Sequence, residues 1–130
     1  MGLKILVVEP NIVARAYCVR ALQLAGIDRS AIREASQGRE ALVMVREERV
    51  DLIITALAMP ELDGPELLVA LRGESQLANI PVVLLTSERN ARRAAAIAQH
   101  GVRGGLERPF RPEAVRAVLN DLLPQSGATT

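Results

Sequence analysis

Short apolar runs rich in β-branched residues recur along the chain, and within each run the apolar residues are continuous and do not alternate with polar ones. The clearest runs are Ile5–Val8, Leu52–Thr55 and Val82–Leu85. Continuous runs are typical of strands that are buried on both faces, as in a parallel sheet covered by helices on each side. Two weaker candidates, Ala31–Ala35 and Gly104–Leu106, complete a prediction of five strands.

Segments with helical periodicity lie between these runs. In Pro112–Leu123 the apolar residues recur at i, i+3, i+4 and i+7, and the proline suits the first turn of a helix. The other predicted helices are Asn11–Ala25, Arg39–Arg49, Pro65–Arg72 and Asn90–His100. Strands and helices therefore alternate along the whole chain. This order predicts an α/β fold, a doubly wound five-stranded parallel sheet with right-handed crossovers and helices on both faces.

The chain has 130 residues, which is the size of one domain. A hydrophobic share of 49% beside 24% charged residues excludes an intrinsically disordered protein. We expect the domain to span residues 1–123, followed by a flexible tail or linker stub at 124–130. The net charge of +1 does not favour a nucleic acid or a membrane surface. Without a recognisable signal peptide or membrane span, a cytoplasmic location is expected.

In open parallel sheets the functional crevice lies beyond the carboxyl ends of the strands. Motifs at and around these ends resemble the receiver domain of two-component response regulators, and chemotaxis regulators in particular, over Leu3–Leu123. The segments that carry the resemblance are Lys4–Glu9, Ala41-Leu42, Asp51–Ile54, Ala58–Gly64 (Ala-Met-Pro-Glu-Leu-Asp-Gly), Pro81–Thr86 and Pro109-Phe110. The resemblance implies the (βα)5 flavodoxin-like receiver fold.

The resemblance also implies a chemistry that this chain has largely lost. Receivers hold Mg²⁺ with an acidic pair after the first strand and accept a phosphoryl group on an Asp that ends the third. A Thr or Ser after the fourth strand and a Lys after the fifth contact that group. The matching residues are Glu9, Pro10, Ala56, Thr86 and Arg108. Because a methyl group accepts no phosphoryl group, we expect no usual phosphorylation. With Glu9 as a weak Mg²⁺ candidate at best, no metal or cofactor is expected.

Two further departures concern how such a pocket would signal. We expect Arg108 to pair with Glu9 in place of the metal, because a guanidinium suits a carboxylate; the alternative is that Arg108 points to water. Gly105 stands at the switch position, where the family has an aromatic residue, so no ring is available to swing inward. An engineered Asp-to-Ala change at position 56 is an alternative origin for Ala56. Because Pro10 and Arg108 depart from the pattern as well, a naturally degenerate receiver is favoured.

If this pocket is not phosphorylated, the function must lie on an interaction surface. The region around the predicted fourth helix, fifth strand and fifth helix is locally basic, which either favours an acidic partner or is simply a solvated face. Its basic residues are Arg89, Arg92, Arg93, Arg103, Arg111 and Arg116. The helix predicted at Asn11–Ala25 is apolar around most of its circumference, so a partner covers it or exposed apolar groups are tolerated. Cys18 on this helix is interpreted as a small buried hydrophobe.

These patterns predict a receiver-like module of two-component signalling that is not an enzyme. It would bind a kinase, an effector or a second copy of itself, with a homodimer as one form. Direct nucleic-acid binding is not expected, since aromatic residues make up only 2% of the chain. Two alternatives stay open: a regulatory domain of a longer transcriptional regulator or hybrid kinase, and a flavodoxin-like binder of a small ligand in the same crevice.

Overall fold

The computed structural model describes residues 3–86, 104–107 and 111–122. Its strands are β1 (Ile5–Val8), β2 (Ile32–Ala35), β3 (Leu52–Ala56), β4 (Val82–Thr86) and β5 (Gly104–Glu107). Its helices are α1 (Ile12–Leu24), α2 (Gly38–Glu47), α3 (Gly64–Arg72) and α5 (Pro112–Leu122), and a 3-10 turn, Arg29–Ala31, precedes β2. The helix predicted at Asn90–His100 lies outside the described residues.

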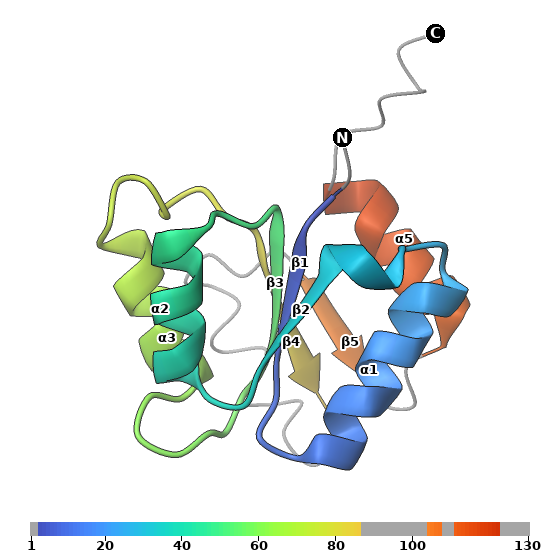
Figure 1. The fold of residues 1–130 in the computed structure, drawn as a ribbon, viewed down its shortest axis with the longest axis horizontal. Coiled ribbons are helices and arrows are strands. Elements are labelled where there is room, and N and C mark those ends of the chain that lie inside the picture. Colours follow the sequence, from blue (N-terminus) through green and yellow to red (C-terminus); the bar gives the residue numbers. More distant parts are fainter. Residues whose placement is uncertain (1–2, 87–103, 108–110, 123–130) are drawn as a thin grey trace, which may run out of the picture.

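The five strands form one parallel sheet in the order β2-β1-β3-β4-β5. Helices α1 and α5 cover one face of the sheet and α2 and α3 cover the other (Figure 1). The predicted doubly wound α/β fold is therefore confirmed. The crossover from β1 through β2 back to β3 reverses the direction in which strands are added, so β1 and β3 lie side by side at the centre.

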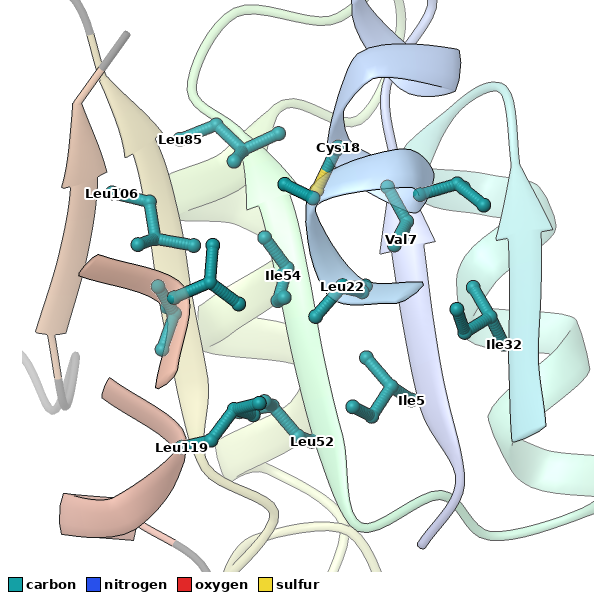
Figure 2. Packing of buried hydrophobic residues seen from close by; sticks show 14 residues of the cluster. Ile5, Val7, Cys18, Leu22, Ile32, Leu52, Ile54, Leu85, Leu106 and Leu119 are labelled. Carbon is teal, nitrogen blue, oxygen red and sulfur yellow. The ribbon is translucent and has the colours of Figure 1, made fainter. Parts of the chain in front are cut away.

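The core of the domain has two halves, one on each face of the sheet. Every residue of β1 and β3 is buried, as the continuous apolar runs predict. On the α1 and α5 face, strand side chains such as Ile5 and Ile54 meet Leu22 of α1 and Leu119 of α5 (Figure 2). Leu6 and Ile53 point to the opposite half, under α2 and α3. Burying each of these side chains contributes about 1.5–3 kcal/mol before conformational entropy is counted.

The helix and strand ends differ by a residue or two from the sequence prediction, for local reasons. Asn11 lies outside α1 as its N-cap, and its Oδ1 accepts a hydrogen bond from the backbone N–H of Ala14 at 2.9 Å. Strand β2 begins at Ile32 and not at Ala31, because Ala31 belongs to the 3-10 turn that Asp28 caps. Helix α3 begins one residue early, since Asp63 and Glu66 form a capping box.

Strand β2 is an edge of the sheet, and its charged residues Arg33 and Glu34 are consecutive, so their side chains point to opposite faces. Arg33 pairs with Glu48 at 2.6 Å. Glu34 pairs with both Arg15 of α1, at 2.9 Å, and Arg29 of the preceding turn, at 2.7 Å. These pairs fasten the edge strand to the helix on each side of it.

Candidate functional site

The carboxyl ends of β1 and β3 place the two central sequence-predicted site residues next to each other. Val8 pairs with Thr55 in the parallel register, so Glu9 and Ala56 follow side by side at the edge of the sheet. Leu85 of β4 pairs with Ala56, and Thr86 comes directly after it. The strand order therefore brings Glu9, Ala56 and the backbone of Thr86 together at the carboxyl end of the sheet.

Glu9 is a buried carboxylate that the local backbone holds in place. Its side chain is only 5% exposed, and it accepts a hydrogen bond from the backbone N–H of Asn11 at 2.8 Å. Its own backbone N–H donates to the carbonyl of Ala35 at 3.0 Å, and its carbonyl accepts from Arg15 at 2.7 Å. These contacts fix the turn between β1 and α1, so the carboxylate has a defined position at the carboxyl end of β1.

The next residue, Pro10, is exposed and contributes neither a carboxylate nor a backbone donor. Of Glu9, Pro10 and Ala56, only Glu9 can offer an anionic oxygen. Mg²⁺ in proteins is held through carboxylates and waters in near-octahedral geometry, with one or two carboxylates and substrate phosphates usual. No group of three or more His, Cys, Asp or Glu side chains that could hold a metal occurs within the described residues. Among these three residues, Glu9 alone supplies the kind of oxygen donor that Mg²⁺ favours.

Ala56 ends β3 and is 6% exposed, so its methyl group occupies a largely buried position. The neighbouring Thr55 hydroxyl donates to the carbonyl of Ala56 at 3.0 Å and lies 3.9 Å from the sulfur of Met59. Met59 packs against the core half under α2 and α3, whereas Ile54 belongs to the other half. The Thr55 hydroxyl is thus fully buried on the face away from α1.

The loop after β3 is held tightly against the end of the strand. The backbone N–H of Gly64 donates to the carbonyl of Leu57 at 2.9 Å, and a Cβ at Gly64 would lie 2.7 Å from the Ala56 carbonyl oxygen. Glu61 adopts φ 64°, and Leu62 N–H donates to the carbonyl of Pro60 at 2.7 Å, closing a γ-turn. The Met-Pro-Glu-Leu-Asp-Gly motif therefore makes a compact wall beside position 56.

Sequence reasoning missed two residues that build the other side of this wall. Gly38, the first residue of α2, packs so closely on the Leu62 carbonyl that a side chain there would clash with it. Beside it, the Oε1 atom of Gln37 is buried and has no hydrogen-bond partner among the described residues. A glycine that opens a helix does signal close packing, but the sequence does not say which segment it meets.

Cys18 of α1 is buried in the core half that it shares with β1 (Figure 2). Burial, and secondarily the negative charge of Glu9, raises the pKa of its thiol to about 12. The thiolate is therefore scarce at neutral pH, which agrees with the interpretation of Cys18 as an apolar core residue.

Several predicted positions fall outside the described residues. They are Arg89, Arg92, Arg93, Arg103 and Arg108. Only the backbone is described at Thr86 and Gly105, which pair with Glu107 and Leu84 in the ladder of β4 and β5. Arg111 and Arg116 are exposed, and Arg116 donates to the carbonyl of Leu24 at 3.4 Å. The basic face is thus described only at its α5 end.

Known proteins share both the sequence pattern and this arrangement. A family model described as the response regulator receiver domain matches residues 5–120. A chemotaxis protein CheY homolog of Campylobacter jejuni is 30% identical over 122 residues, which are 93% of this chain and 92% of that protein. The two-component response regulator ORR11 of Oryza sativa is 34% identical over 124 residues, which are 92% of this chain and 80% of that protein.

Solved structures resemble the whole domain as well. The chemotaxis response regulator CheY4 of Vibrio cholerae has a TM-score of 0.75 at 32% identity, covering 95% of this chain and 100% of that one. A putative response regulator of Chloroflexus aurantiacus has a TM-score of 0.83 at 25% identity, covering 94% and 98%. Across the described part of the chain, none of the helices has the length and apolar character needed to span a bilayer.

Proposed function

The chain belongs to the response regulator receiver domain family, and from that premise we propose that it is a pseudo-receiver of two-component signalling. In this proposal it acts by binding other proteins and not by accepting a phosphoryl group in the family's usual way. The observation that carries the proposal is Ala56, a largely buried methyl group at the strand end where receivers have the acceptor Asp.

The side chains around Ala56 are poor replacements for that acceptor. The Thr55 hydroxyl is fully buried and hydrogen-bonded to the Ala56 carbonyl, on the face of the sheet away from α1. The Glu9 carboxylate is held against the backbone of Asn11. Nucleophilic attack on a phosphoryl donor needs an accessible carboxylate and a metal that neutralises the developing charge. A pocket with one fixed carboxylate supports neither requirement.

The proposal extends to the metal and to the lysine position. With Pro10 and Ala56 contributing no oxygen ligand from their side chains, Mg²⁺ binding is weak or absent. Arg108, outside the described residues, would then supply a fixed positive charge to Glu9 in place of the cation. The domain would keep one state whether or not a phosphoryl donor is present, and its partner, a kinase, an effector or a second copy, would bind it constitutively.

The experiment is intact-mass analysis after incubation with acetyl phosphate and Mg²⁺. We expect no mass increase for the natural sequence. The matched positive control is the double variant Ala56→Asp with Pro10→Asp, which returns the acidic pair and the acceptor to the same fold and should gain one hydroxylamine-labile phosphoryl group. A labile adduct on the natural sequence would contradict the proposal and direct attention to Glu9 or Glu61. Failure of both proteins to label, beside a working receiver that labels fully, would contradict the role given to Ala56.

A further inference from the structure

Helix α1 carries a concentration of exposed apolar side chains. Of the six large hydrophobic residues exposed in the described part of the chain, four lie on this helix. They are Ile12 (71% exposed), Val13 (60%), Tyr17 (68%) and Leu24 (52%). The remaining two, Val43 and Val69, lie on separate helices on the opposite face of the sheet. Scattered apolar residues need no explanation, but a cluster on one helix marks a contact surface.

The exposed side of α1 has the spacing of a helix-pairing seam. Cys18 and Leu22 point into the core, as Figure 2 shows. On the outside, Val13, Tyr17, Arg20 and Leu24 follow one another at intervals of four, three and four residues. Side chains at such intervals form one stripe along a helix, and this is the spacing by which two helices interlock. We call these four residues the α1 stripe.

We propose that the α1 stripe binds the α1 stripe of a second copy of this chain, with the two helices antiparallel. A twofold axis that passes between positions 18 and 19 pairs every residue of the stripe with another member of it. Val13 then meets Leu24 of the second copy, and Tyr17 meets Arg20 of the second copy. The stripe is therefore self-complementary, as an isologous twofold interface requires.

The charge in the stripe favours this partner and this direction. No ion pair among the described residues involves Arg20, which is exposed. In the antiparallel pair its guanidinium lies against the ring of Tyr17 of the second copy, a cation–π contact that forms twice. A parallel pair would instead place the two Arg20 side chains together. Helix α1 also has no acidic residue in its first turn and no basic one in its last, so an antiparallel neighbour offsets its dipole.

The area of the α1 stripe limits the affinity that we expect for the dimer. A helix of 13 residues is about 20 Å long, so the stripe alone buries less than the roughly 800 Å² per partner of a standard interface. Dimerisation should therefore be weak and concentration-dependent. The inference does not depend on the state of the phosphorylation pocket, because no residue of the stripe belongs to that pocket.

Sedimentation equilibrium over micromolar to millimolar protein is the first test. We expect a reversible dimer whose dissociation constant rises at least about tenfold in Tyr17→Arg, because two arginines then face each other. The double variant Tyr17→Arg with Arg20→Tyr exchanges the two partners and should restore the dimer. The matched control is Val69→Arg, at a residue that is 71% exposed on α3, and it should dimerise like the natural sequence.

Disulfide cross-linking tests the direction of the helices. A mixture of the Val13→Cys and Leu24→Cys variants should form mixed dimers under mild oxidation, whereas each variant alone should form few. Buried Cys18 gives the background in the natural sequence. A protein that stays monomeric at millimolar concentration overturns the proposal and leaves the stripe to a helix of another protein. Preferential cross-linking of Val13→Cys to itself, or loss of the dimer in Val69→Arg, also overturns it. The acetyl phosphate experiment is unaffected by these outcomes.

Discussion

Returning a carboxylate to position 56 is a direct test of the electrostatics inferred for the crevice. The register sets Glu9 beside position 56, and neighbouring strands lie about 4.8 Å apart. In the Ala56→Asp variant two carboxylates would therefore lie within about 5 Å of each other. Both positions are nearly buried, at 5% and 6% exposed, so water would screen the two charges poorly.

The repulsion can be estimated from this geometry. Two unit charges about 5 Å apart in an effective dielectric of about 20 repel by about 3 kcal/mol. The hydrogen bond that the Asn11 N–H donates to the Glu9 carboxylate reduces that figure. We therefore expect Ala56→Asp to lower the free energy of unfolding by about 1–3 kcal/mol at pH 8 without metal. Millimolar Mg²⁺ should recover much of this loss, because a second carboxylate makes a better cation site, and should leave the natural sequence unchanged.

The pH dependence of the loss follows from linkage. The repulsion raises the pKa of the carboxyl introduced at position 56 in the folded state above its unfolded value of about 4. The folded variant then binds protons more tightly than the unfolded chain. The loss of stability should be absent below about pH 4, grow as the pH rises toward the raised pKa, and be complete above it.

Urea unfolding followed by circular dichroism is the suitable assay, since the chain has no tryptophan for fluorescence. The control is Ala56→Asn, which has almost the same shape as Ala56→Asp but no charge. If the two variants lose the same stability at pH 8 and neither responds to Mg²⁺, the change is steric. The reasoning about Glu9 and the missing acceptor would then be wrong.

Three further outcomes are expected. Gly64→Ala should destabilise the fold by about 1–3 kcal/mol in urea titrations, because the added Cβ would lie 2.7 Å from the Ala56 carbonyl oxygen. Gly73→Ala, whose nearest atoms are 3.5 Å away, is its control and should be neutral or slightly stabilising. Glu61→Gly should raise the thermal midpoint, because a φ of 64° costs a non-glycine residue about 1 kcal/mol. The ion pair with Arg39 that this change removes is exposed and contributes little to stability. A lower midpoint would refute this expectation. Cys18, with a thiol pKa raised to about 12, should react with an aromatic disulfide at pH 8 only after urea unfolds the chain, and rapid labelling of the native protein would contradict its burial.

The sequence predicted the sheet because the strands are specified by their own residues. Ile5–Val8 and Leu52–Ala56 are buried along their whole length. A short uninterrupted apolar run is most stable as a central strand that is covered on both faces. The meeting of the strand ends follows from strand order alone, since parallel strands end on the same side of the sheet. Neighbouring ends such as Glu9 and Ala56 must then lie together.

What the sequence did not predict depends on contacts between distant segments. Asn11–Ala25 was expected to be apolar on most sides, but periodicity did not tell that Val19 and Leu22 are buried while Val13 and Tyr17 face outward. The neighbours of the helix decide this. The close approach of Gly38 to Leu62, 24 positions later in the sequence, is likewise set by how α2 and the loop before α3 meet. No local sequence pattern predicts a close contact between two segments this far apart in the chain.

The charged pairs along β2 have a consequence for how copies of the chain can associate. An edge strand offers unpaired backbone groups to any other strand, which is the usual start of aggregation. Here Arg33 and Glu34 are each tied into ion pairs, with Glu48 on one side and with Arg15 and Arg29 on the other. A strand that added to this edge would place its own side chains beside those charges and would reduce their contact with water. These ion pairs thereby disfavour the addition of a further strand at the β2 edge of the sheet.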